Sequence, residues 1–209
     1  MNVSLNEVEA TAKRATRGAG YSWGLAEEAA KATRWLCAHG QNGTGALAQL
    51  LQLDLASTPK THAPSDLSGE WQSENQLCPL VTGALLSDCA HRLNSSPIAI
   101  RNVAVPALLL PFAANAARFL ATCVSVDYDH ALAETDGFDL SLDAPIPDRA
   151  HQVSVHLGGQ LTAPVPHRTR AEPDPTDWAV LNRFAHRTYA PATEESRLRG
   201  AGAGLSDND

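Results

Sequence analysis

The spacing of apolar residues changes along this chain, and that change is the strongest constraint on its fold. In residues 1–56 the apolar residues recur every three or four positions, as in a helix with one buried face. Several segments between residues 97 and 157 alternate between apolar and polar side chains, which is typical of strands. A helical pattern returns after residue 174. Helices, then strands, then a closing helix predict an α+β fold and not a regular βαβ alternation.

Capping signals define the expected N-terminal helices. Ser4 and Glu7 form a capping box at the start of the first helix. Glycines follow the first and second helical patterns, and glycine is a common helix stop. We therefore expect helices over residues 4–16, 22–40 and 45–55.

The middle of the chain is expected to form a sheet. A polar stretch at residues 57–76 contains two prolines and is interpreted as a loop. Short strands separated by turn residues predict an antiparallel or mixed sheet. The expected strands cover residues 80–86, 97–105, 105–110, 123–128, 138–142 and 152–157, with a short alanine-rich helix at 111–120.

The closing helix has a well-marked start. Asp174 occupies the cap position, Pro175 the first helical position and Asp177 the first turn. This helix should end near Tyr189. Residues 1–209 are interpreted as a single domain, with a helical part at 1–56, a sheet part at 77–165, and a closing helix and tail at 174–209.

Composition and charge indicate a soluble protein. The 23 acidic residues outnumber the 16 basic ones and give a formal charge of -7, which repels nucleic-acid backbones. The most apolar segment, residues 103–126, contains two prolines, Asn115 and Arg118, so we interpret it as buried core and expect no membrane partner. Charges throughout the first 20 residues predict no signal peptide and a cytoplasmic location. The four cysteines form no CxxC pair and are expected to be reduced.

The first candidate site is a polar cluster near the C-terminus. Arg187, Tyr189, Ser196 and Arg197 precede a glycine-rich segment at residues 200–204. Guanidinium groups match carboxylates and phosphates, and glycines allow backbone amides to surround an anion. The alternative is a solvated helix end followed by a flexible tail.

Two aromatic residues near the N-terminus are added to this candidate site. Tyr21 and Trp23 follow the glycines at the end of the first helical pattern. Amphipathic aromatic side chains often line ligand pockets. The alternative is a hydrophobic plug at the start of a helix.

A second candidate site has the residue types of a metal centre. Asp127 and Asp129 end a predicted strand, and His151 and His156 lie on the next strands. Oxygen and imidazole ligands suit a divalent metal. Aspartates at a strand end are also common turn residues, and the spacing is not specific.

Two Cys-Ala-His tripeptides, at residues 37–39 and 89–91, are a further candidate. A cysteine and a histidine can form a nucleophile and its base. Positions two apart on a helix do not face each other, however. We therefore interpret Cys37 as a buried thiol and His39 as a helix-end residue.

Three segments resemble an uncharacterised bacterial family with a domain of unknown function (DUF3726-like). They are Ser4–Ala10, Arg17–Glu28 and Arg187–Arg197. The resemblance extends over nearly the whole chain. It implies a bacterial cytoplasmic protein and brings no known activity, cofactor or catalytic residue.

A partial likeness covers only the first helices. Ser4–Glu9 and Ala38-His39-Gly40 are similar to the start of the malate and lactate dehydrogenase family that lacks a Rossmann domain. That family has Ser-His-Gly near this point, whereas Ala38 replaces the serine here and the spacing is shorter. The chain is also too short for that enzyme.

Three functions remain open from the sequence. The leading hypothesis is a protein that binds or converts an anionic small metabolite, as an enzyme or an enzyme accessory. The second is a non-catalytic homo-oligomeric interaction protein, such as a homodimer with an alanine-rich interface. The third is a metal-dependent hydrolase or lyase.

Overall fold

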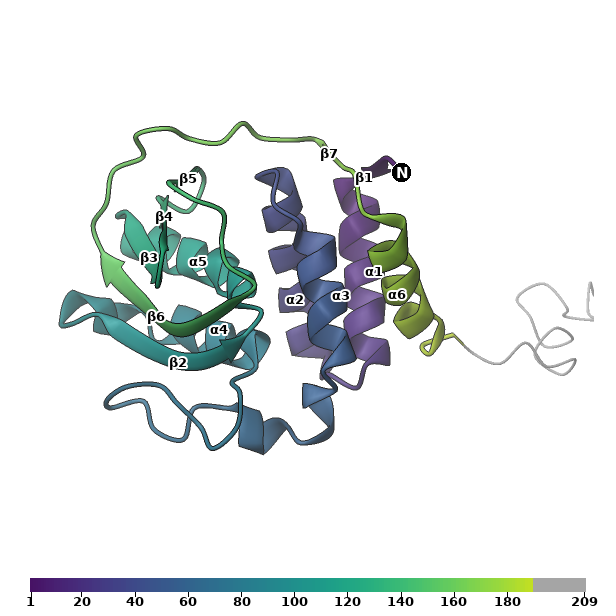
Figure 1. Ribbon diagram of the computed structural model, residues 1–209, viewed down its shortest axis with the longest axis horizontal. Helices are drawn as coiled ribbons and strands as arrows, with labels where there is room; N and C mark the ends of the chain where they lie inside the picture. Colours follow the sequence, from purple (N-terminus) through teal and green to yellow (C-terminus); the bar gives the residue numbers. More distant parts are fainter. Residues whose placement is uncertain (190–209) are drawn as a thin grey trace, which may run out of the picture.

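The computed structural model describes residues 1–189, and the fold is that of this part of the chain. A group of helices and a β-sheet with two further helices lie side by side (Figure 1). This arrangement confirms the predicted α+β class. Residues 190–209, which include Ser196 and Arg197, lie outside the described residues.

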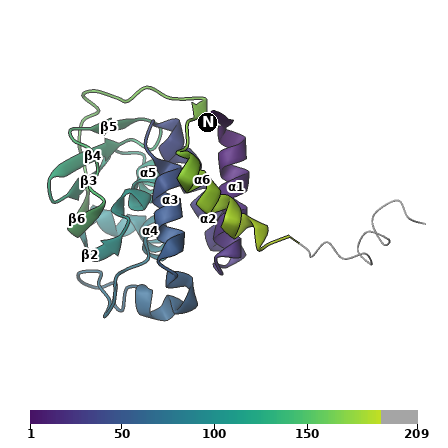
Figure 2. The same cartoon turned by 45° about the vertical axis from the view of Figure 1, so that its right-hand side comes forward.

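The helical group contains the three expected N-terminal helices and the closing helix. Ser4 caps the first of them, because its Oγ accepts a hydrogen bond from the backbone N–H of Glu7 at 3.1 Å. Ser22 and Asp174 cap the second and the last in the same way. The last helix packs across the first and the third (Figure 2). These helices are α1 (Leu5–Gly18), α2 (Trp23–Ala38), α3 (Gly43–Gln52) and α6 (Pro175–His186).

The main sheet has five antiparallel strands in the order β2-β6-β3-β4-β5. Val126 in the central strand lies opposite Val155 and Ala133, and all three are buried. A separate strand pair joins the N-terminus to the segment before α6. The strands are β2 (Ile98–Ala104), β3 (Val124–Tyr128), β4 (Ala131–Thr135), β5 (Leu140–Leu142) and β6 (Arg149–Leu157), with β1 (Val3–Ser4) and β7 (Arg170–Ala171) as the pair.

Two predicted strands are wrong. Residues 80–86 belong to a helix, α4 (Pro79–Asp88), and residues 106–109 form a short 3-10 helix that leads into α5 (Leu110–Leu120). A short, continuously apolar run is compatible with a buried strand or a buried helix, so spacing does not separate the two. Proline in the first turn of each helix is the local signal that favours the helix.

Other differences concern strand limits and the polar stretch. The strand β4 was not expected, and β6 starts three residues before the predicted strand. Residues 57–76 contain a 3-10 helix at Pro59–His62 and a bridge between Trp71 and Ile100. This stretch is therefore attached to β2 and is not a free loop.

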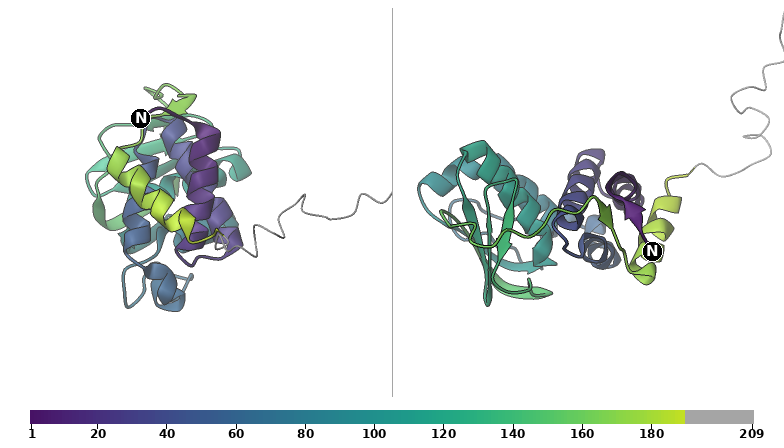
Figure 3. Two further views of the ribbon diagram at one scale, coloured as in Figure 1. Left: turned by 90° about the vertical axis from the view of Figure 1, so that its right-hand side faces the viewer. Right: turned by 90° about the horizontal axis from the view of Figure 1, so that it is seen from above.

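The helix α5 lies between the two parts of the molecule. It contacts α2 on one side and the strands β3 and β4 on the other. Seen from above, the sheet and the helical group lie on either side of this contact (Figure 3). The buried apolar residues form one cluster that includes members of both parts.

Within residues 1–189, no helix combines the length and the apolar character needed to cross a bilayer.

Candidate functional site

An open groove of about 400 Å³ lies between α2 and the turn at residues 136–139. We call it the α2 groove. Its walls carry aromatic and cationic side chains, including Trp35, Phe138 and Arg118. A smaller cavity of about 210 Å³ shares Lys31, Trp35 and Arg118 with it, so the two are neighbours. Chain segments far apart in the sequence therefore meet here.

Two other cavities, of about 340 and 360 Å³, surround the connection between α2 and α3. Asp148 and Asp177 line the first, and Glu172, Asp174 and Arg168 line the second, so both linings carry a net negative charge. Such linings create a negative potential that repels anions. Compared with these two cavities, the α2 groove has the charges that suit an anionic ligand.

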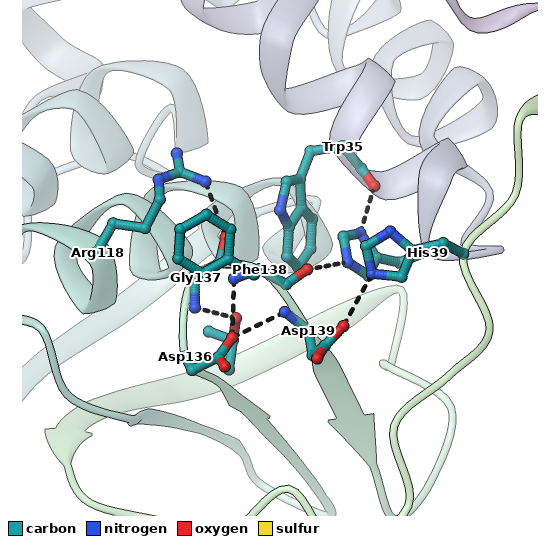
Figure 4. Close-up of polar contacts among 9 residues, drawn as sticks. Trp35, His39, Arg118, Asp136, Gly137, Phe138 and Asp139 are labelled. Atoms are coloured by element: carbon teal, nitrogen blue, oxygen red, sulfur yellow. Dashed lines mark hydrogen bonds and ion pairs between the residues drawn. The ribbon is translucent and has the colours of Figure 1, made fainter.

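His39 connects the two walls of the α2 groove. It is 2% exposed and occupies the C-cap of α2. Its Nδ1 lies 2.8 Å from the backbone oxygen of Trp35, and its Nε2 lies 2.9 Å from the backbone oxygen of Phe138 (Figure 4). The indole of Trp35 also packs against the ring, with centroids 3.9 Å apart. His39 thus attaches the turn to the end of α2.

Both contacts of the His39 ring are to carbonyl oxygens, which only accept hydrogen bonds. A neutral imidazole carries one N–H and donates to one carbonyl at a time. The geometry therefore matches an imidazole that lies between the end of α2 and the turn, within hydrogen-bonding distance of a carbonyl of each.

Hydrogen bonds hold the turn at residues 136–139 in one conformation. The carboxylate of Asp136 accepts from the backbone N–H groups of Phe138 and Asp139, each at 2.8 Å (Figure 4). The backbone N–H of Gly137 donates to Oγ1 of Thr135 at 2.9 Å. Gly137 has a φ of 97°, which favours glycine. The Phe138 side chain is therefore presented from a rigid backbone.

Asp136 should make this turn sensitive to acid. Hydrogen bonds from the backbone N–H groups of Asp139 and Phe138 hold the pKa of the Asp136 carboxyl below its usual range. A carboxyl whose pKa is lowered on folding stabilises the fold above its unfolded pKa, and this contribution is lost as the pH falls through the folded pKa. We expect Asp136→Ala to lower the free energy of unfolding by about 1 kcal/mol at neutral pH.

The pH dependence of this effect can be measured by urea unfolding. The difference between the wild type and Asp136→Ala should shrink as the pH drops below about 4. Asp127→Ala removes an exposed carboxylate from the same sheet and is the control. A difference that stays constant down to the acid transition would contradict the role assigned to Asp136.

Among the cationic side chains that line the groove, Arg118 has the charge that is least compensated. Its Nη1 donates to the backbone oxygen of Gly137 at 2.8 Å, and its other contact is with the side-chain oxygen of Asn115. Within residues 1–189 it forms no ion pair with a carboxylate, whereas Lys31 pairs with Glu28 at 2.7 Å. The neutral partners of Arg118 orient the guanidinium without cancelling its charge.

A histidine and an aspartate form a pair at the edge of the groove. Nε2 of His167 lies 3.0 Å from Oδ1 of Asp139. A nitrogen that faces a carboxylate carries the proton, so the neutral ring has its lone pair on Nδ1. The ring of His167 also meets that of His39 edge-on, with centroids 4.5 Å apart. Asp139 and His39 thus fix the position of the His167 ring at the edge of the groove.

The predicted C-terminal cluster lies at a different place. Arg187 packs over the ring of Phe184 at 4.5 Å, and Tyr189 is half exposed beside His186. Neither side chain lines the α2 groove. Because Ser196 and Arg197 lie outside the described residues, a site that includes them stays a prediction.

Tyr21 and Trp23 point into different environments. Tyr21 is buried, and its hydroxyl lies 3.5 Å from Sγ of Cys78. Burial, followed by the nearby Cys78, raises the pKa of this phenol well above its usual range. Trp23 is 61% exposed beneath the guanidinium of Arg17. Tyr21 is a core residue here, and neither of the two side chains lines the α2 groove.

The predicted metal residues stand on or beside β3 and β6. Asp129 accepts a hydrogen bond from the backbone N–H of His151 at 2.9 Å and has a φ of 55°, as expected of a turn residue. Asp127 and His156 lie opposite Ser154 and Ser125. Across the part of the chain that the structure describes, no three His, Cys, Asp or Glu side chains are arranged to hold a metal ion.

The residues of the α2 groove were missed because their sequence signals are weak. His39 was recognised as a helix-end residue but not as a link to Phe138, which is 99 positions away. The dipeptide Asp136-Gly137 is a turn signal that indicates the bend but not the groove. No local pattern distinguishes Arg118 or His167 from an ordinary surface residue.

The fold and the groove define an α+β protein with a candidate anion site between its helical group and its sheet. Residues 3–81 of the 209 match the sequence model of a family described as "Protein of unknown function (DUF3726)". This match confirms the predicted resemblance over α1, α2, α3 and the start of α4, and therefore over the α2 wall of the groove. No curated protein and no solved structure matches the chain.

Proposed function

We propose that this protein binds an anionic small molecule in the α2 groove, as an enzyme or as an accessory to one. The observation that carries the proposal is Arg118, whose guanidinium lines two neighbouring cavities and has only neutral partners within the described residues. An arginine fork matches a carboxylate or a phosphate. An anion is thus the ligand that would complete the contacts of this side chain.

The surrounding charges support selective binding. The chain as a whole has a formal charge of -7, so an anion is repelled from most of its surface. In the α2 groove, Lys31 and Arg34 add positive charge, although each also pairs with a glutamate. A local basic site on an acidic protein favours small anions over polyanions such as nucleic acids.

The His167–Asp139 pair supports the enzymatic form of the proposal. His167 lines the same groove, and Asp139 faces its Nε2, so the lone pair of the neutral ring lies on Nδ1. A base next to an anion anchor is suited to proton transfer on the bound molecule. An accessory protein would use the same groove for binding alone.

The test compares anion binding by wild type and an Arg118→Gln variant. We expect the variant to bind citrate and inorganic phosphate about tenfold more weakly, because charged hydrogen bonds contribute about 1.5–3 kcal/mol. Isothermal titration calorimetry on the full chain measures the change. Arg149→Gln removes the same charge from an exposed position on β6 and is the control. Equal weakening in both variants would show a general charge effect and refute the α2 groove as the site.

The second candidate function is that of a homo-oligomeric interaction protein. Phe119 and Phe138 are 73% and 67% exposed, and they lie on segments joined by the contact between Arg118 and Gly137. Exposed aromatic side chains are frequent at protein interfaces. Sedimentation of the full chain measures its oligomeric state directly. A dimer that dissociates on Phe119→Ser substitution would support this function, and a concentration-independent monomer would refute it.

A further inference from the structure

We propose that the ligand of the α2 groove is a planar aromatic monoanion, such as an aromatic carboxylate. Its ring would lie against Phe138 and Trp35, and its charged group would meet Arg118. This inference rests on the proposed function and narrows it to one class of ligand. Three features of the groove support it: an exposed phenylalanine on a hydrogen-bonded backbone, an indole shared by two cavities, and the balance of charges.

Phe138 combines high exposure with a fixed backbone. Its side chain is 67% exposed, yet its N–H donates to Asp136 and its carbonyl lies 2.9 Å from Nε2 of His39. A large apolar ring in water is unfavourable, and fixing its backbone also costs conformational entropy. A site that holds an aromatic residue in place before binding loses little further entropy when the ligand arrives. Phe138 therefore fits the role of a preorganised stacking surface.

Trp35 offers a second aromatic surface. Its indole packs against His39 and lines both the α2 groove and the smaller cavity. Figure 4 shows the ring of Phe138 between the side chains of Arg118 and Trp35. Among the aromatic contacts of residues 1–189, Phe138 and Trp35 do not pair with each other. The two rings are thus free to contact a third, and aromatic rings prefer stacked or edge-to-face geometry.

The charges of the groove indicate one negative charge on the ligand. Lys31 pairs with Glu28, Arg34 pairs with Glu9, and Asp139 pairs with His167. This leaves Arg118 as the cation without an anionic partner within the described residues. Arginine has five N–H donors, and the two contacts of Arg118 leave others for a carboxylate. A polyanion would also meet the carboxylate of Glu9, which lines the groove.

The test uses three small probes of similar size on the full-length protein. Benzoate has a planar ring and a negative charge, cyclohexanecarboxylate has the charge without the flat ring, and benzamide has the ring without the charge. Cyclohexanecarboxylate is the more apolar anion, so burial alone would favour it. We expect benzoate to bind about fivefold more tightly than cyclohexanecarboxylate, from the usual strength of aromatic pairs. NMR titration measures weak dissociation constants of this kind.

Two matched variants locate the aromatic contact. Phe138→Leu keeps an apolar side chain but removes the ring, and it should abolish the preference for benzoate over cyclohexanecarboxylate. Phe119→Leu makes the same change at another exposed phenylalanine, one that does not line the groove, and should keep the preference. If both variants behaved alike, the assignment of Phe138 would be overturned.

The probes separate this inference from the proposed function. Equal affinity for benzoate and cyclohexanecarboxylate, with both weakened in Arg118→Gln, would overturn the aromatic class and leave the anion site intact. Benzamide binding as tightly as benzoate would refute the anion site itself. Absence of binding by all three probes, together with no binding of citrate or phosphate, would refute both.

Discussion

Replacing Trp71 with alanine is expected to lower the free energy of unfolding by about 4 kcal/mol, as for other fully buried tryptophans. Trp71 is 1% exposed and belongs to the main hydrophobic core. Its backbone is also bonded to β2, because its N–H donates to the carbonyl of Ala99 and its carbonyl accepts from the N–H of Arg101. Loss of the indole would leave a cavity beneath the segment at residues 57–76. Urea unfolding followed by circular dichroism measures the effect.

Two other variants control for the change of residue type. Trp23→Ala removes a tryptophan that is 61% exposed and contacts Arg17, so it should lower the free energy of unfolding by no more than about 1 kcal/mol. Trp71→Phe keeps most of the buried ring and should cost less than Trp71→Ala. If Trp71→Ala were as mild as Trp23→Ala, the segment at residues 57–76 would not be anchored through this side chain.

Gly18→Ala is expected to cost about 3 kcal/mol, at the upper end of the usual range for overpacking. A Cβ at this position would lie 1.9 Å from the backbone oxygen of Phe184 and 2.9 Å from its carbonyl carbon. Backbone atoms do not rotate away, so α6 would have to move from α1. Gly18 is the last residue of α1, and α6 crosses α1 (Figure 2), which places the backbone of Phe184 next to Gly18.

Gly24→Ala is the matched control, because nothing lies within 4 Å of a Cβ at that position of α2. Alanine is the better helix former, so Gly24→Ala should stabilise the protein by up to about 1 kcal/mol. Thermal unfolding and limited proteolysis near α6 report both changes. A stabilising Gly18→Ala would contradict the close packing of α1 and α6.

The helices were predictable because their signals are local. The cap residues Ser4, Ser22 and Asp174 each bond to a backbone N–H two or three positions further on, and such a bond depends little on the rest of the molecule. The buried side of α6, with Trp178, Leu181, Phe184 and Ala185, also follows directly from helical spacing. Even so, α1 continues two residues past its predicted end.

The sheet region was harder to predict. An apolar run such as Leu80–Leu86 is compatible with either a helix or a strand until its neighbours are known. In the structure α5 covers one face of α4, and Gly83 allows the ring of Phe112 to approach the helix closely. The strand β4 was missed because it pairs with β3 through backbone hydrogen bonds that leave no distinct sequence pattern.

The candidate site was even harder to predict from the sequence than the sheet. The predicted cluster at Arg187 and Tyr189 was assembled from neighbours in the sequence, whereas the α2 groove is assembled from distant segments. Arg118 comes from α5, Phe138 from the turn after β4, and His167 from the connection between β6 and β7. A linear pattern of residues does not contain these contacts.

By itself, the sequence determined the fold class, the starts of the capped helices and the family resemblance over the N-terminal helices. These properties depend on periodicity and on bonds between residues a few positions apart. Only the tertiary structure decided that His39 links α2 to the turn bearing Phe138, and that Arg118 faces the same groove. The physical reason is that these residues are up to about a hundred positions apart in the sequence. They meet only because α5 packs between the helical group and the sheet.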